Sequence, residues 1–178
     1  MAVNFLKVVE GYEVIMKITA IEKYGLRCLL VLARGGPDKQ LSISDIAEKE
    51  GLSVPYTSKL LSILRKAGLV QAERGRGGGF NITREAAEIT LFDVLTALGG
   101  PLVEPHHCSR YTGNLKECIH IDRCSVHDVL DSLADYVQHF LTETTLEDIL
   151  KEDKTAYLKK DDYKFILSNA NIENKLTG

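Results

Sequence analysis

The chain has 178 residues, of which 44% are hydrophobic and 26% are charged, and its formal net charge is −3 at pH 7. This composition is typical of a folded globular protein and excludes a collagen-like or wholly disordered chain. Charged residues interrupt every apolar run before the roughly 18 residues that a membrane span requires. Residues 1–15 lack a small-residue cleavage site and carry charges within their apolar stretch. We therefore expect a cytoplasmic protein with no membrane association.

Three helices with clear start and stop signals are predicted before residue 70. Each begins at a Ser or Thr that can cap a helix and ends at a glycine; the pairs are Thr19 and Gly35, Ser42 and Gly51, and Ser53 and Gly68. Thr19 and Ser42 are each followed three residues later by an acidic residue, which completes a capping-box pattern. The second and third helices are separated only by the turn at 51–53, which predicts a helix-turn-helix.

The chain then changes to an extended pattern. Residues 69–74 and 80–83 flank a glycine-rich turn, which predicts a two-stranded β wing. Thr90 with Asp93 predicts another short capped helix ending at Gly99. Residues 101–123 show no clear period and are predicted to form a loop.

From Cys124 onward, apolar residues recur at helical spacing over about five turns. The stripe consists of Val126, Val129, Leu133, Val137 and Phe140. One short chain offers too little surface to cover this stripe, so we expect a homodimer that packs along it. One or two further helical turns are predicted up to residue 150, followed by a charged tail.

The predicted fold is mainly α with a small β wing, a winged helix-turn-helix domain plus a long dimerisation helix. The expected division is an N-terminal extension (1–15), a DNA-binding domain (16–100), a cysteine-bearing loop (101–123), a dimerisation helix (124–150) and a flexible charged tail (151–178).

The charge of the chain is strongly segregated. Residues 53–84 contain six cations and one anion, a net charge of +5, which leaves −8 for the remainder. A compact basic segment can neutralise phosphates even on an acidic protein, so we expect a double-stranded DNA operator as partner. The residues predicted to contact DNA are the first turns of the third helix and the wing tip: Ser53, Tyr56, Thr57, Ser58, Lys59, Arg74, Arg76, Gly77 and Gly78.

The glycine run at 75–79 also resembles a loop that binds a nucleotide phosphate. Such a loop leads from a strand into a helix, whereas this run connects two predicted strands. A wing tip is therefore the favoured interpretation. The sequence shows no Ser/His/Asp set and no evident pair of catalytic carboxylates, so we expect neither an enzyme nor a small-molecule substrate.

Three of the four cysteines crowd into one segment. Cys108, Cys118, Cys124 and His127 have the spacing C-x9-C-x5-C-x2-H. Three thiolates and an imidazole suit either a zinc ion or an iron–sulfur cluster, and the spacing alone does not choose between them. The fourth cysteine, Cys28, lies among leucines and is predicted to be a small buried hydrophobic residue.

Four segments resemble winged-helix transcription regulators of the Rrf-two type. They are residues 16–19, 64–70, 74–80 and 88–94. With the cysteine segment, the resemblance is greatest to the iron–sulfur cluster regulator (IscR) branch, and it runs from about residue 16 to residue 150. It implies a [2Fe–2S] cluster held by Cys108, Cys118, Cys124 and His127, although the gap between the first two cysteines is longer than is usual there.

Other candidates for the fourth cluster ligand remain. They are the loop residues His106, His107 and His120, and Glu22, because some relatives use an acidic residue from the first helix of the partner subunit as the ligand. We rank Glu22 lower, because it already completes the capping box of the first helix. The function implied by the resemblance is a sequence-specific regulator that senses cluster status and controls genes such as those for cluster assembly. The alternatives are a nitric-oxide-responsive or iron-responsive repressor with the same cluster, or a zinc-stabilised interaction module.

Overall fold

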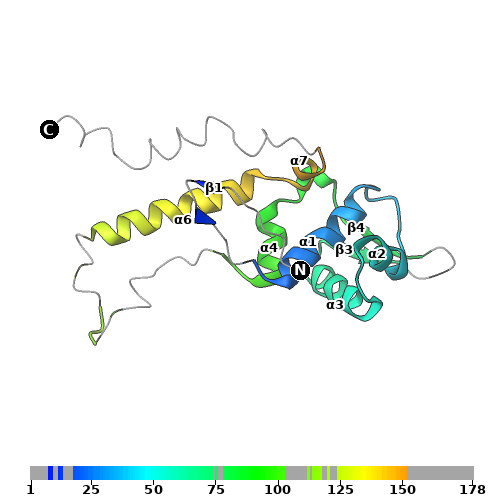
Figure 1. The fold of residues 1–178 in the computed structure, drawn as a ribbon, viewed down its shortest axis with the longest axis horizontal. Coiled ribbons are helices and arrows are strands. Elements are labelled where there is room, and N and C mark those ends of the chain that lie inside the picture. The colour runs from blue at the N-terminus through cyan, green and yellow to red at the C-terminus, as the bar shows by residue number, and fades with distance from the viewer. Residues whose placement is uncertain are drawn as a thin grey trace.

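A computed structural model, shown in Figure 1, describes residues 18–73, 75, 78–102, 112, 114–117, 120 and 124–151, and the backbone of residues 8–9 and 12–13. The described helices are α1 (Ala20–Ala33), α2 (Ile43–Glu50), α3 (Val54–Lys66), the 3-10 helix η1 (Ala86–Glu88), α4 (Leu91–Gly99), α6 (Ser125–Glu143) and α7 (Leu146–Leu150). The described strands are β1 (Val8–Val9), β2 (Tyr12–Glu13), β3 (Val70–Ala72) and β4 (Phe80–Ile82).

The helix starts predicted from capping residues are confirmed. The Thr19 side chain accepts a hydrogen bond from the backbone N–H of Glu22, whose carboxylate accepts one from the N–H of Thr19 at 2.6 Å. Ser42 with Asp45 and Thr90 with Asp93 form the same reciprocal pairs. Each pair satisfies backbone donors that a helix leaves open in its first turn, which fixes where the helix begins.

Helices α1, α2, α3 and α4 surround one apolar core. Leu29 and Leu32 of α1, Leu60 and Leu64 of α3 and Val94 of α4 are fully buried in it. Gly25 allows α1 and α4 to lie close together, because a Cβ atom there would stand 2.4 Å from Cδ2 of Leu98. This packing holds α2 and α3 as the predicted helix-turn-helix, with Gly51 in the left-handed conformation (φ 64°) at the turn.

The predicted wing is confirmed as the antiparallel pair of β3 and β4. Val70 is opposite Ile82 and Ala72 is opposite Phe80, so both strands are shorter than the extended runs in the sequence. A bridge between Leu41 and Phe80 extends the sheet on the β4 side. Gly79 permits this bridge, because a Cβ atom there would stand 2.6 Å from the carbonyl oxygen of Leu41. The wing is thereby attached to the segment that leads into α2.

Helices α6 and α7 have different surroundings. Figure 1 shows α6 projecting away from α1–α4, whereas α7 lies against them. Leu146 of α7 is fully buried and belongs to the same core as α1 and α3. The backbone N–H of Leu91 donates to Thr144 at 2.7 Å, and that of Leu146 donates to Ile89 at 2.9 Å. These two bonds attach the end of α6 to the start of α4.

The structure adds detail that the sequence patterns did not predict. The further helical turns predicted up to residue 150 are α7, which the expected division placed with the dimerisation helix but which packs into the core formed by α1–α4. The pair β1–β2 and the 3-10 helix η1 were also not predicted. Among the residues that the structure describes, no helix combines the length and apolarity needed to span a bilayer.

Candidate DNA interface and cysteine segment

The predicted recognition helix is α3, and its first turn is built as a capped, exposed surface. The side chain of Ser53 accepts a hydrogen bond from the backbone N–H of Tyr56 at 3.4 Å, and Pro55 lies in the first turn, where its missing N–H costs nothing. Ser53, Ser58 and Lys59 are exposed, and Tyr56 is half-buried. This end of α3 therefore presents hydroxyls and one cation to solvent.

The structure corrects the predicted set of DNA-contacting residues at Thr57. Its side chain is fully buried, and its hydroxyl has no hydrogen-bond partner among the described residues. The reason is the helical period: Thr57 shares the apolar face of α3 with Leu60, Leu61 and Leu64. It therefore cannot reach a base edge, and we remove it from the set.

Helix α1 supplies an aromatic and cationic cluster beside the recognition helix. The Tyr24 and Tyr56 rings meet edge to face, with centroids 6.2 Å apart and planes at 81°. Lys23 Nζ lies 4.9 Å from the centre of the Tyr24 ring, and the Arg27 guanidinium lies 5.9 Å from it. Arg27 Nε is also 2.5 Å from the carboxylate of Glu50 in α2. The ring contact joins α1 to α3 and the ion pair joins α1 to α2, whereas both cation–π contacts lie within α1.

Sequence analysis missed this cluster. Tyr24 fits the apolar period of the first helix, which by itself predicts only a position on the buried face. Its neighbour Tyr56 is 32 positions away in the chain, as the numbering gives, so no local pattern connects the two rings. A basic residue on each side of Tyr24, at 23 and 27, is the one signal that the sequence offers.

The described part of the wing is a tight glycine turn. The N–H of Glu73 donates to the carbonyl of Gly79, and the N–H of Gly78 donates to that of Gly75, both at 3.0 Å. Gly75 has φ 124°, a conformation that favours glycine. The side chain of Gln40 donates to the Glu73 carboxylate, which connects the wing to the start of the helix-turn-helix. The predicted contacts Arg74, Arg76 and Gly77 lie outside the described residues.

Two of the four predicted cluster ligands are described, and both lie at the start of α6. Cys124 caps this helix: its Sγ accepts a hydrogen bond from the backbone N–H of His127 at 3.4 Å. Both residues are partly buried. Cys108 and Cys118 lie outside the described residues, as do His106 and His107, whereas His120 is described and exposed. Within the described part of the chain, no group of three potential ligands could hold a metal ion.

The His127 imidazole lies near two carboxylates of its own helix. Its Nε2 is 3.2 Å from Asp131, one turn further on, and its Nδ1 is 3.8 Å from Asp128, which is too long for a hydrogen bond. A histidine that ligates a metal commonly donates its other ring N–H to a carboxylate. Asp131 lies at a distance from the His127 ring that suits this role.

Glu22, a lower-ranked candidate ligand, and Cys28, the cysteine outside the cluster, both lie within the helical domain. Glu22 is buried, and its carboxylate completes the cap of α1. Cys28 is fully buried in the core, as predicted, and burial raises the pKa of its thiol to about 11, with a smaller contribution in the same direction from Glu50.

The predicted dimerisation stripe is largely exposed on α6. Val126, Val129 and Leu133 are 64%, 67% and 57% exposed. Val137 and Phe140, nearer the domain, are half-buried. Aliphatic side chains this exposed over two turns of one helix form a surface that a partner can cover.

A helix-turn-helix followed by a β wing defines the chain as a winged-helix protein of the DNA-binding class. Residues 18–152 match the model of the Rrf2 family, described as iron-dependent transcriptional regulators. The chain belongs to the Rrf2 family and is a DNA-binding transcription regulator. The resemblance found in the sequence is thereby confirmed.

The curated relatives support this assignment over most of their length. The chain is 31% identical over 139 residues to the HTH-type transcriptional regulator IscR of Photorhabdus laumondii. This alignment covers 78% of the present chain and 82% of the relative. It is 32% identical over 137 residues to the protein rrf2 of Nitratidesulfovibrio vulgaris. That alignment covers 77% of the present chain and 89% of the relative.

Solved structures confirm the winged-helix fold. The T. potens IscR structure has a TM-score of 0.60 and 30% identity, covering 79% of this chain and 90% of that one. The structure of CymR, the global cysteine regulator of B. subtilis, has a TM-score of 0.60 and 31% identity. The match covers 76% of the present chain and 96% of CymR.

Proposed function

We propose that this protein is a cytoplasmic, homodimeric, non-enzymatic regulator that binds a specific double-stranded DNA operator and senses iron–sulfur cluster status. In this proposal a [2Fe–2S] cluster is held by Cys108, Cys118, Cys124 and His127, and the regulated genes include those for cluster assembly. The observation that carries it is the pairing of Cys124 and His127 in the first turn of α6. The names of the IscR relatives support it.

The donor groups at the start of α6 fit such a cluster. Cys124 supplies a sulfur and His127 supplies an imidazole within one turn of α6, and both are donor types that iron–sulfur clusters accept. Asp131 beside His127 is suited to orient the imidazole as a ligand. When bound, the cluster supplies a one-electron redox centre.

The chain itself connects this position to the DNA-binding domain. Cys124 begins α6, and the far end of α6 is bonded to α4 through the backbone of Thr144 and Leu146. Any shift of α6 that follows a change at Cys124 therefore acts on the helices that support α3. The proposed mechanism is thermodynamic linkage: if the cluster favours one arrangement of α6, it changes DNA affinity by the same coupling free energy.

The proposed DNA contacts combine the exposed end of α3 with the wing. Ser53, Tyr56 and Ser58 would meet base edges, and Lys59 would meet a phosphate. Arg74, Arg76, Gly77 and Gly78 of the wing would approach the neighbouring minor groove. The exposed stripe of α6 would pack against a second copy of the chain.

Anaerobic purification tests the cluster directly. We expect red-brown protein with about two iron and two sulfide ions per chain. Cys124→Ser should be colourless, because a hydroxyl does not replace a thiolate on iron, and His127→Cys should retain a cluster with altered absorption. The matched control is Cys28→Ala, which removes a buried cysteine outside the site and should retain the colour. Colourless wild-type protein containing about one zinc ion per chain would support a zinc-stabilised module instead.

A further inference from the structure

A cavity of about 350 Å³ lies between the second half of α1, the segment that joins α1 to α2, and the end of α2. We name it the α1–α2 pocket; its lining residues are Val31, Arg34, Gly35, Lys39, Leu41, Lys49 and Glu50. This volume falls within the range of small-molecule sites. None of the lining residues belongs to α3 or to the wing strands, so the pocket is separate from the proposed DNA contacts.

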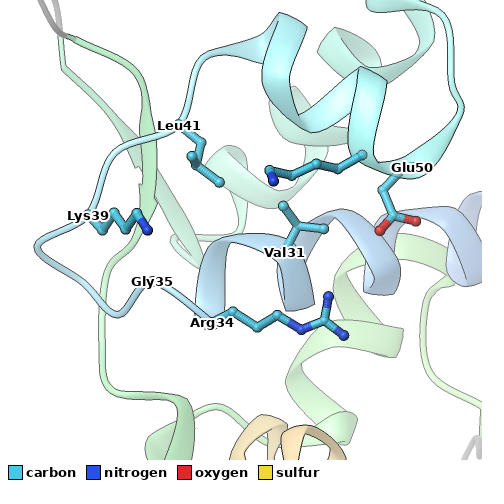
Figure 2. Close-up of a pocket in the computed structure, with 7 residues that line it drawn as sticks. Val31, Arg34, Gly35, Lys39, Leu41 and Glu50 are labelled. Carbon is cyan, nitrogen blue, oxygen red and sulfur yellow. The ribbon is translucent and has the colours of Figure 1, made fainter.

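The pocket combines an aliphatic wall with cationic groups. Val31 and Leu41 supply apolar surface, and Figure 2 shows Lys39 to the left of Val31 and Arg34 below it. Lys49 of α2 is the third cation in the lining. Within the described part of the chain, none of these three cations forms an ion pair.

The one acidic group in the lining is already neutralised. Glu50 has a side chain that is only 8% exposed, and its carboxylate is paired with Arg27 at 2.5 Å. Arg27 is not a lining residue, so its charge offsets Glu50 from outside the cavity. The three lining cations therefore set the sign of the potential in the pocket.

The backbone positions one of these cations. A Cβ atom on Gly35 would stand 2.8 Å from Cδ and 2.9 Å from Cβ of Lys39, so the stem of Lys39 lies directly against the glycine. An exposed lysine usually loses side-chain entropy when it binds an anion. Contact with Gly35 reduces that loss, because the stem is already placed at the edge of the pocket.

We propose that the α1–α2 pocket binds a small organic anion, with a carboxylate or phosphate group on a short apolar body. Arg34, Lys39 and Lys49 hold the anionic group, and Val31 and Leu41 contact the apolar body. Such a ligand bridges α1 and α2 and so fixes α2, which supports the recognition helix. It is an effector site on the DNA-binding domain, distinct from the cysteine segment.

Phenyl phosphate is a suitable probe, because it carries both parts of the proposed ligand. Isothermal titration of the full chain should show saturable binding of phenyl phosphate that is tighter than that of inorganic phosphate or of phenol. Arg34→Ala with Lys39→Ala should raise the Kd by about tenfold or more, through loss of charge-assisted hydrogen bonds. Gly35→Ala should raise it too, by displacing the Lys39 stem while leaving every charge in place.

Lys66→Ala is the matched control, since Lys66 is an exposed cation of the same domain that does not line the pocket. It should leave the Kd unchanged within about twofold. Circular dichroism should show native helix content for every variant, because the substituted side chains are on the surface. Equal affinity of the double variant and the wild type would overturn the proposal, as would the absence of saturable binding.

A DNA titration separates this site from the proposed function. With a random-sequence duplex, the slope of log K against log salt should be the same for the double variant and the wild type. A slope smaller by about two units would show that Arg34 and Lys39 bind DNA phosphates, and the effector proposal would be wrong. If the wild type binds no DNA, the proposed function is wrong, whereas the phenyl phosphate titration still decides whether the α1–α2 pocket binds an organic anion.

Discussion

Thr57 shows how one residue can satisfy two sequence patterns at once. Its hydroxyl and its place near the start of α3 are typical of residues that contact DNA, whereas its spacing of three, four and seven positions from Leu60, Leu61 and Leu64 places it on the apolar face. In the structure the spacing decides, because the core of four helices buries that whole face. The sequence therefore contained the signal for burial.

The first prediction concerns this residue. Thr57→Val replaces a buried hydroxyl that has no partner among the described residues with a methyl group of similar size. It should raise the free energy of unfolding by about 1 kcal/mol, measured by urea denaturation, because a desolvated hydroxyl is removed. DNA affinity should change by less than about twofold. A change in base preference in Thr57→Val would show that Thr57 does contact DNA. We expect Tyr56→Phe, in contrast, to alter the base preference.

The second prediction concerns the pH dependence that Cys28 creates. The pKa of its thiol is raised from 9.0 to about 11 by burial, so the unfolded chain releases this proton at lower pH than the folded chain. The contribution of Cys28 to stability is complete below pH 9 and is lost as the pH rises toward 11. Urea titrations across this range should show a fall in the free energy of unfolding that is smaller in Cys28→Ala. Equal falls in both proteins would contradict the assignment.

At the scale of secondary-structure elements, the helix boundaries were predictable because local chemistry fixes them. Thr19, Ser42 and Thr90 each satisfy N–H groups of the turn that follows, a contact within four residues of sequence. Gly51 and Gly68 end their helices with positive φ angles, which glycine adopts at little cost. Signals of this kind need no knowledge of the rest of the fold.

The positions of α7 and Tyr24 were not predictable from such signals. Five residues of α7 do not show whether Leu146 faces the core or solvent, because that depends on the bridge between Thr90 and Thr145. The contact between Tyr24 and Tyr56 depends in the same way on how α1 crosses α3. Packing between distant segments, rather than propensity, decides both.

The third prediction concerns α6. Leu133→Asp with Val137→Asp places one charge at an exposed and one at a half-buried position of the apolar stripe, and should convert dimers to monomers at micromolar concentration, measured by light scattering. The control is Ser132→Asp with Gln138→Asp, which adds the same charges at exposed positions of α6 outside the stripe. Dimers that survive the first pair of substitutions would show that dimerisation does not use this stripe.

At the scale of the whole molecule, positive charge is concentrated on the elements that are expected to contact DNA. The excess of +5 in residues 53–84 coincides with α3 and the wing, whereas the remainder of the chain carries −8. An acidic remainder limits nonspecific attraction to DNA, so that the basic face determines how the protein approaches the duplex.

The fourth prediction tests that face. Arg74→Ala removes a wing cation, at a position outside the described residues, and should weaken DNA binding. The slope of log K against log salt should fall by about one unit, because one phosphate contact is lost. Lys116→Ala, an exposed lysine far along the chain from residues 53–84, is the control and should leave the slope unchanged. The same slope in both variants would exclude Arg74 from the interface.

The last prediction concerns the connection between the cysteine segment and DNA binding. The core of α1–α4 consists of residues between 21 and 98 with only α7 added, so it does not depend on Cys124. Cys124→Ser should therefore keep the helical circular dichroism of the wild type while losing the cluster. A structural metal site behaves differently, because removal of a ligand unfolds the module that depends on it.

Operator titrations under anaerobic conditions then measure the coupling. The Cys124→Ser variant should still bind DNA through α3 and the wing, but its affinity for an operator selected with the cluster-loaded protein should fall by about five- to 150-fold, the usual range of allosteric coupling. Its affinity for a random duplex should be unchanged, because the basic face is intact. If the variant unfolds, the metal is structural. If it binds the selected operator as tightly as the loaded protein, α6 does not transmit the state of Cys124 to α3.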